Sequence, residues 1–198
     1  MPSPGTLVHG EFYHIFNRGN NRDDIFLEDR NYSFFLDRYK RYVSSLVETY
    51  AYCLLRNHFH FLVRIKDYEQ LPESLRFKKP GIIFGRLFSS YAKSFNSIYG
   101  HSGSVFEHPF GRVRIRTGSQ LMRVVTYIHQ NPEKHGYVDD FREWRFSSYL
   151  ALIGSRQTSL DRETVIGWFG SVGEFIGSHE EELNFEVLKG IFPGDDES

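Results

Sequence analysis

The sequence predicts an α+β sandwich of the ferredoxin-like or RNA-recognition-like kind, with an antiparallel sheet of about four to five strands and helices packed on one side of it. Two observations predict this fold. Segments with apolar residues at alternate positions are interleaved with segments whose apolar residues recur at helical spacing. These segments follow one another as strand, helix, strand, strand, helix, strand and helix, which is the order of elements in that sandwich.

The first strand and a central hairpin have clear strand patterns. Residues 11–16 have the aromatic and β-branched content of a strand, and the turn formers of 17–22 follow them. Residues 48–55 are apolar on both alternations, which is typical of a strand covered on both faces. A two-residue link then leads into the next strand, 58–65, so the sequence predicts a hairpin.

Three helices are predicted from apolar residues at helical spacing. The first spans about 28–46, and the second spans 80–100 with a proline at its start. The third is expected over 120–131, with Ser119 as its N-cap and Pro132 as its stop. Each has one apolar side, so all three are expected to pack on the sheet.

The bulk composition limits the class of protein. The chain has 198 residues, 40% hydrophobic and 17% aromatic, which is enough for one sizeable core. We expect one domain over 1–155 and an acidic extension over 156–198, with short helices at 161–170 and 180–191. Cys53 is the only cysteine, which excludes an internal disulfide and a cysteine-built zinc site. There is no apolar run of about 18 residues and no secretory leader, so we expect a cytoplasmic protein without a membrane span.

The charge is unevenly distributed, although the formal net charge is only -1. From 76 to 123 there are nine basic residues and one acidic residue, a local balance of +8. From 161 to 198 there are two basic and ten acidic residues, a local balance of -8. A basic, aromatic-rich middle suits a phosphate backbone, but a solvated surface with a few extra basic residues explains the charge equally well.

Two histidines lie at alternate positions of the strand predicted at 58–65. His58 and His60 share one face, whereas Phe59 and Phe61 lie on the other, apolar face. The pleat holds the two histidines roughly 7 Å apart along the strand. That spacing suits two ligands of one divalent ion, although a His-x-His pair in a strand is more often solvent-facing or hydrogen-bonded.

A tyrosine and an asparagine lie on one flank of the third predicted helix. Tyr127 and Asn131 are one turn apart, at the edge of the apolar side of that helix. They therefore project together. The alternative is a half-buried tyrosine that only packs and an asparagine favoured by the helix end.

Arginines alternate along the strand predicted over 111–116. Arg112, Arg114 and Arg116 share one face, whereas the apolar residues between them face the core. One explanation is that these charges keep an exposed edge strand from pairing with another chain. Phosphate contact is favoured because the guanidinium group matches phosphate geometry.

Four stretches of the sequence resemble the single-tyrosine HUH transposases of bacterial insertion sequences, in particular their REP-associated branch. They lie between about residues 10 and 150, in the order of that family. The stretches are Tyr13-His14-Ile15-Phe16-Asn17-Arg18-Gly19-Asn20-Asn21-Arg22, Asn57-His58-Phe59-His60-Phe61-Leu62-Val63, Tyr127-Ile128-His129-Gln130-Asn131-Pro132 and Trp144-Arg145-Phe146-Ser147-Ser148-Tyr149.

The resemblance implies a site and a reaction. It implies that Tyr127 is the nucleophile and that His58, His60 and Asn131 hold Mg²⁺ or Mn²⁺. It also implies single-stranded DNA with a hairpin as the substrate, a 5′-phosphotyrosine intermediate and a possible homodimer. The residues expected to contact DNA are Arg18, Asn20, Arg22, Lys78, Lys79, Arg86, Arg112, Arg114 and Arg116.

Other functions remain compatible with the same residues. A non-catalytic hairpin or single-strand nucleic-acid-binding module would use the arginines and aromatics, and Tyr127 would only pack. A nickase of the replication-initiator type would use the same chemistry for replication. The short chain, the single candidate tyrosine and the lack of a Gly-rich phosphate loop favour the transposase. A zinc metallohydrolase is disfavoured because the sequence has no His-Glu-x-x-His helix.

Overall fold

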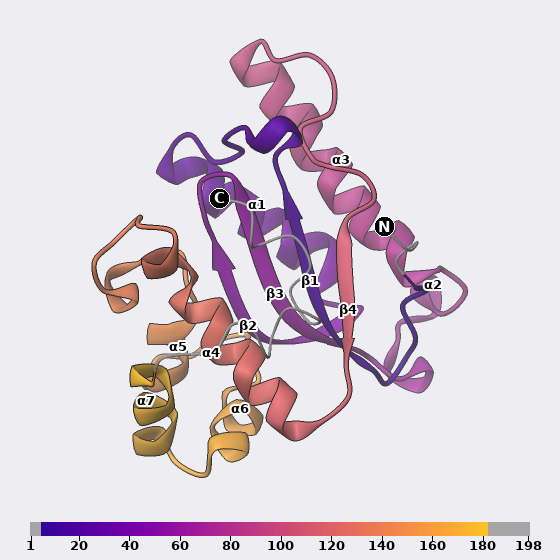
Figure 1. The fold of residues 1–198 in the computed structure, drawn as a ribbon. Coiled ribbons are helices and arrows are strands. Elements are labelled where there is room, and N and C mark those ends of the chain that lie inside the picture. Colours follow the sequence, from indigo (N-terminus) through magenta and orange to yellow (C-terminus); the bar gives the residue numbers. More distant parts are fainter. Residues whose placement is uncertain (1–4, 182–198) are drawn as a thin grey trace.

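A four-stranded antiparallel sheet forms the centre of the molecule (Figure 1), in a computed structural model that describes residues 5–181. The strand order is β2-β3-β1-β4, and every neighbouring pair is antiparallel. The predicted sandwich is therefore confirmed, including the hairpin that joins β2 to β3. The strands are β1 (Phe12–Arg18), β2 (Val47–Leu54), β3 (His58–Ile65) and β4 (Gly111–Ile115).

The helices follow the apolar stripes that the sequence shows. The two long helices before β4 and the helix after it match the three predicted regions, and short helices complete the chain. The α-helices are α1 (Asp29–Val43), α2 (Glu73–Arg76), α3 (Pro80–Tyr99), α4 (Gly118–Lys134), α5 (Tyr149–Ile153), α6 (Arg162–Phe169) and α7 (Val172–Glu180). Single 3-10 turns lie at Asn20–Arg22, Tyr68–Gln70 and Phe141–Glu143.

Helices cover both faces of the sheet, so the expectation that they lie on one side was wrong. On one face α1 and α3 pack over Ile15, Phe59 and Phe61. On the other face α4 packs over Leu62 and Ile115 (Figure 1). Leu62 lies on the same face as the two histidines and is fully buried. A hydrophobic residue at that position requires a cover, and α4 provides it.

The ends of α4 differ from those predicted. Thr117, not Ser119, is the N-cap, and its hydroxyl accepts a hydrogen bond from the backbone N–H of Gln120 at 3.2 Å. β4 ends two residues before Thr117, so the backbone is still extended there. The helix also continues past Pro132 to Lys134, since a proline in the last turn removes only one backbone hydrogen bond.

The region after α4 packs against β2 and α4. The predicted extended segment before α5 is confirmed, because Leu54 N–H donates to Phe146 O at 3.0 Å and Ser148 N–H donates to Tyr52 O at 2.9 Å. α6 matches the helix predicted at 161–170. α7 was not predicted, and the helix predicted at 180–191 lies outside the described residues apart from its first two positions.

The described part of the predicted extension belongs to the same hydrophobic cluster as α4. Val165 of α6 and Phe175 of α7 are fully buried in the cluster that contains Val124 and Ile128. The division into 1–155 and 156–198 stays a prediction. Over residues 5–181, no helix combines the length and apolarity that a bilayer crossing demands.

Candidate active site

The pairing of β1 with β3 places three histidines on the face that α4 covers. Phe16 lies across from His60, and His14 lies across from Leu62. Residues that face each other across an antiparallel pair share a face of the sheet, so His14, His58 and His60 lie together. Arg18, which lies across from His58, belongs to the same face.

Neighbouring side chains orient both histidines of β3. Nδ1 of His58 lies 2.6 Å from Oδ1 of Asn57. A carboxamide oxygen only accepts, so Nδ1 of His58 carries the hydrogen and Nε2 presents its lone pair. Nδ1 of His60 lies 3.0 Å from Nε2 of His14. Both rings therefore use Nδ1 for support and leave Nε2 for another partner.

The helix α4 brings Tyr127 and Asn131 to these histidines. The Tyr127 side chain is 1% exposed, and its ring centroid lies 5.6 Å from that of His60 and 6.1 Å from that of His14, edge to face. Asn131 donates from Nδ2 to the backbone carbonyl of Tyr127 at 2.8 Å. The ammonium group of Lys134 lies 5.3 Å from the centroid of the Tyr127 ring.

Each of the three predicted metal ligands has one buried atom without a hydrogen-bond partner within residues 5–181. These atoms are Nε2 of His58, Nε2 of His60 and Oδ1 of Asn131. Asn131 is a neighbour of His58: it acts on the pKa of His58 in the direction opposite to the larger effects of burial and of His135. Buried polar atoms are normally paired, and a cation would satisfy three acceptors at once. The residues present therefore fit a divalent metal ion.

Electrostatics keep the imidazoles neutral. Burial, followed by the nearby His135, lowers the pKa of His58 to about 3. Burial, followed by the neighbouring His58, also holds the pKa of His60 well below its usual range. A neutral imidazole is the form that binds a metal. Over the described residues, no three His, Cys, Asp or Glu side chains form a metal cluster, so a site here needs the amide oxygen of Asn131.

Comparison with known proteins decides the family. No protein-family model matches the chain. A curated protein of Haemophilus influenzae that carries the name REP-associated tyrosine transposase is 30% identical over 141 residues, which cover 63% of this chain and 76% of that protein. The chain belongs to the REP-associated tyrosine transposases.

A solved structure of this transposase family has the same fold. The structure of a REP-associated tyrosine transposase bound to a REP hairpin matches with a TM-score of 0.57 at 21% sequence identity. The match covers 77% of this chain and 85% of the other. At that identity the likeness concerns the fold.

The DNA contacts predicted for this transposase separate into two groups. Arg18 ends β1 across from His58, and Asn20 and Arg22 lie in the 3-10 turn that follows β1. Arg112 and Arg114 lie across from Ile15 and Tyr13, on the face opposite the histidines. Lys78 and Lys79 precede α3, and Arg86 is exposed on α3. Arg116 is exposed just after β4.

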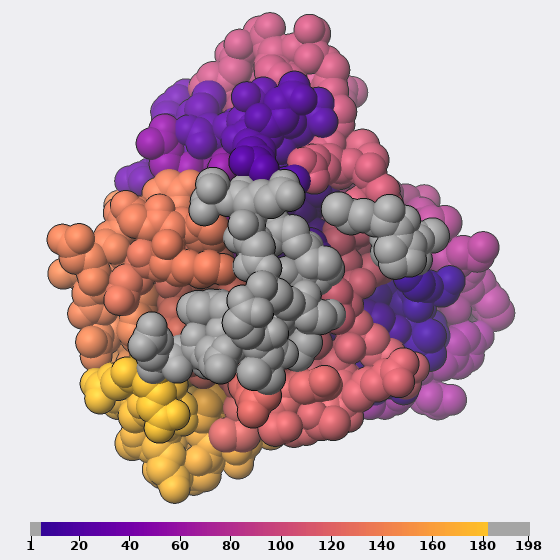
Figure 2. All heavy atoms as spheres, viewed as in Figure 1, coloured from indigo at the N-terminus to yellow at the C-terminus, as the bar shows by residue number. Residues whose placement is uncertain are grey.

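A polar cavity of about 540 Å³ lies beside the site, at the end of β1. Gly19 bridges to Phe106 there, and the loop after β1 adjoins the segment before β4 on the surface (Figure 2). Gly19 N–H also donates to Asn57 O at 2.7 Å, which connects the cavity to the turn before His58. The cavity is lined by Arg18, Asn20, Asn21, Arg22, Glu107 and His108.

Two side chains that support the histidines of the candidate site were not predicted from the sequence. The roles of His14 and Asn57 follow only from strand pairing and from the turn between β2 and β3, although both residues stand inside the family-like stretches. Gln130, next to Asn131, is occupied elsewhere, because its Nε2 donates to His179 O at 2.8 Å.

Proposed function

We propose that this transposase nicks single-stranded DNA at hairpin-flanked sites and transfers the strand through a 5′-phosphotyrosine intermediate. Family membership supports the class of enzyme. One observation supports the assignment of residues: the phenol ring of Tyr127 lies beside two imidazoles and an amide oxygen whose acceptor atoms are buried and lack partners within residues 5–181. We place this activity in the cytoplasm, where the DNA is.

Tyr127 is the nucleophile in this proposal. Its phenol oxygen attacks the scissile phosphorus, and the bond from phosphorus to the 3′ oxygen breaks. The phenol proton is released, and the 3′ oxygen gains a proton to become a hydroxyl. A 3′ hydroxyl of another strand then attacks the phosphotyrosine and releases the phenol. Each step exchanges one phosphoester for another, so no nucleotide cofactor is required.

His58, His60 and Asn131 would hold the divalent ion. Such an ion supplies positive charge that stabilises the phosphate oxygens and the phenolate as charge develops on them. Magnesium prefers oxygen ligands, whereas two imidazoles and one amide oxygen suit manganese better. Lys134 adds a second positive charge near the Tyr127 ring.

Single-stranded DNA with a hairpin is the proposed partner. The transposase with the similar fold was solved bound to a REP hairpin, which supports the same class of ligand for this chain. Arg18 lies across from His58 and lines one cavity together with Asn20 and Arg22, so we expect these residues to contact the nucleotides around the scissile phosphate. The hairpin stem would extend over the second group: Lys78, Lys79, Arg86, Arg112, Arg114 and Arg116.

A covalent-adduct assay tests the proposal. The protein is incubated with Mn²⁺ and labelled hairpin-bearing single-stranded DNA, and a denaturing gel reports DNA that migrates with the protein. We expect an adduct with the wild type and none with Tyr127→Phe. Tyr39→Phe is the matched control: it removes a buried phenol hydroxyl on the opposite face of the sheet, which lies 2.8 Å from Oγ1 of Thr49, and the adduct should persist.

The outcome also separates the alternative functions. Hairpin binding without an adduct, in the presence of Mn²⁺ or Mg²⁺, would favour a non-catalytic binding module. An adduct that persists in Tyr127→Phe would reject Tyr127 as the nucleophile.

A further inference from the structure

A buried hydrogen-bond chain lies on the flank of α4 that faces away from the candidate active site. His129 and Ser148 are fully buried, and His179 is 1% exposed. Nδ1 of His129 lies 2.8 Å from Nε2 of His179, and Nε2 of His129 lies 2.8 Å from Oγ of Ser148. The mechanism proposed for Tyr127 does not use these groups.

The position of every hydrogen in this chain follows from its two ends. The carbonyl of Phe175 only accepts, so Nδ1 of His179 donates to it, at 2.7 Å, and Nε2 of His179 accepts. Nδ1 of His129 must then donate to His179, and Nε2 of His129 accepts from the hydroxyl of Ser148. That hydroxyl in turn accepts from the backbone N–H of Tyr52 at 2.8 Å. Both imidazoles are neutral Nδ1–H tautomers.

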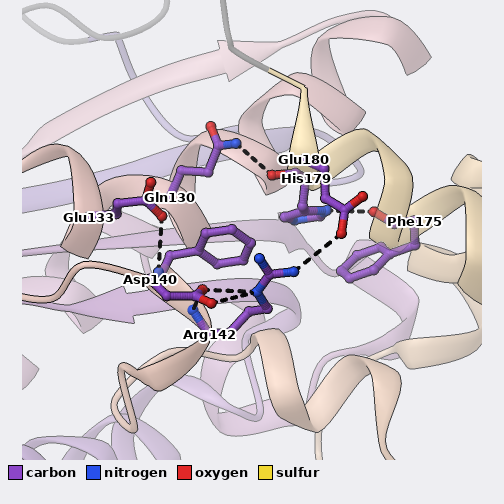
Figure 3. Close-up of polar contacts among 8 residues, drawn as sticks. Gln130, Glu133, Asp140, Arg142, Phe175, His179 and Glu180 are labelled. Carbon is purple, nitrogen blue, oxygen red and sulfur yellow. Dashed lines mark hydrogen bonds and ion pairs between the residues drawn. The ribbon is translucent and has the colours of Figure 1, made fainter.

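These hydrogen bonds connect three elements to α4, the helix that carries Tyr127. Tyr52 is in β2, Ser148 is in the segment that pairs with β2, and His179 is in α7. The next residue of α4 strengthens the contact, since Gln130 donates to the carbonyl of His179 at the end of α7 (Figure 3). α4 is therefore bonded to the sheet on one side and to α7 on the other.

The direction of these bonds restricts the rotation of α4. His129 is two residues after Tyr127, which places the two side chains about 200° apart around the helix axis. Apolar packing alone tolerates small rotations, but hydrogen bonds weaken steeply when distance or angle changes. Any rotation of α4 that moves Tyr127 away from His60 also pulls His129 out of line with Ser148 and His179.

We propose that Ser148, His129 and His179 are positioning residues for strand cleavage. They hold α4 in the rotation that keeps the Tyr127 phenol beside the metal ligands. The effect on rate can be large, because displacing a reacting group by about 1 Å can cost up to a hundredfold in rate. This inference rests on the proposed role of Tyr127 as the nucleophile.

Three variants separate positioning from general stability. Ser148→Ala removes the hydroxyl between Tyr52 and His129, and Ser148→Thr keeps it. Thr126→Val is the matched control. Thr126, like Ser148, has a buried hydroxyl group, but it lies in α4 and donates to Met122 O of the same helix at 3.2 Å.

The first readout is the single-turnover rate of adduct formation at saturating hairpin DNA with Mn²⁺, together with the DNA dissociation constant and the thermal midpoint. We expect Ser148→Ala to slow the reaction about tenfold at an unchanged dissociation constant, and Ser148→Thr to recover most of the rate. The rate of Thr126→Val should stay within about twofold of the wild-type rate, although its thermal midpoint falls about as much as that of Ser148→Ala.

The second readout does not depend on cleavage. Long-range ¹H–¹⁵N NMR at neutral pH should show His129 and His179 as neutral Nδ1–H tautomers. An Nε2–H tautomer of either residue would contradict the hydrogen-bond directions given above and the positioning role that rests on them. If the wild type forms an adduct and Ser148→Ala forms it equally fast, the positioning role is rejected and the proposed function stands. If the wild type forms no adduct, the proposed function fails and the positioning role fails with it.

Discussion

Nδ1 of His60 lies 3.0 Å from Nε2 of His14, and both side chains are 1% exposed. If Nε2 of His60 binds a metal ion, Nδ1 must carry the hydrogen and donate it to His14. His14 would then fix both the tautomer and the ring orientation of a metal ligand without touching the metal. Metal affinity would then depend on a residue that is not itself a ligand.

Replacing His14 should therefore weaken metal binding. In His14→Phe the aromatic ring can still stack on Phe16, whose ring centroid is 4.8 Å away, but the acceptor for His60 is lost. We expect Mn²⁺ affinity to fall about tenfold or more, the usual cost of losing such a partner. Calorimetric titration of Mn²⁺ measures it. His101→Ala, at an exposed histidine, should bind Mn²⁺ like the wild type. Equal affinities for all three proteins would rule out the supporting role.

Tyr127 and the proposed metal ligands come together within one chain. Tyr127 and His60 of the same molecule have ring centroids 5.6 Å apart. Two inactive variants, Tyr127→Phe and His60→Ala, should therefore remain inactive when they are mixed, because neither chain contains both groups. The adduct gel checks this, and light scattering reports the mass of the protein with and without DNA. Restored activity in the mixture would show that a partner chain donates the tyrosine, as a homodimer would allow.

The two groups of basic residues should differ in their effects. Arg18 lies across from His58 and 2.7 Å from Glu107, whereas Arg86 is exposed on α3, behind the sheet. We expect Arg18→Ala to lower the rate of adduct formation at saturating DNA. Arg86→Ala should instead weaken DNA affinity and reduce the slope of the logarithm of the DNA association constant against the logarithm of salt concentration by about one. Its rate of adduct formation at saturating DNA should be unchanged. The same effect of both substitutions on the saturated rate would contradict this division.

The periodicity of side chains was sufficient to predict most of the fold. Alternation in β3 and the apolar stripes of α1 and α3 fixed their positions, because both patterns are local. All helices were expected on one side of the sheet, although residues 48–55 have the pattern of a strand covered on both faces and Leu62 lies among the histidines at a position that has to be buried. Both ends of α4 were predicted wrongly. The start depends on how soon the chain leaves β4, and the end depends on the ability of the last helical turn to accept Pro132.

The candidate site was predictable in part for a similar reason. Tyr127 and Asn131 are one helical turn apart and the two histidines are two strand positions apart, so each pair is local in sequence. Contacts between distant segments were not predictable: His14 meets His60 across 46 residues, and His129 meets His179 across 50. Strand pairing and helix docking produce such contacts, and neither leaves a periodic signal.

The buried histidine pair should make stability depend on pH. Burial lowers the pKa of His179 to about 4, whereas an unfolded histidine titrates near 6.5. Between these values the unfolded chain binds a proton that the native chain does not, so the native state loses stability as the pH falls from 6.5 towards 4. Above pH 6.5 His179 is neutral in both states, so the protein keeps all of this stability.

Urea titrations from pH 7.5 to 5 measure this dependence. One such histidine contributes about 1.4 kcal/mol per pH unit to the slope below pH 6.5. His179→Gln offers an amide oxygen as an acceptor to His129 and removes the titrating group, so its slope should be shallower by about that amount. His101→Gln should keep the wild-type slope. Parallel curves for the wild type and His179→Gln would contradict the assignment.

The central claim is that Tyr127 forms the covalent bond to DNA. Mass spectrometry of the nuclease- and protease-treated adduct tests it most directly. We predict that the remaining nucleotide is attached to the peptide that contains Tyr127, by a bond from the phenol oxygen to a 5′ phosphate, and that His58→Ala forms no such peptide. A nucleotide found on any other residue, or one joined through a 3′ phosphate, would contradict the account.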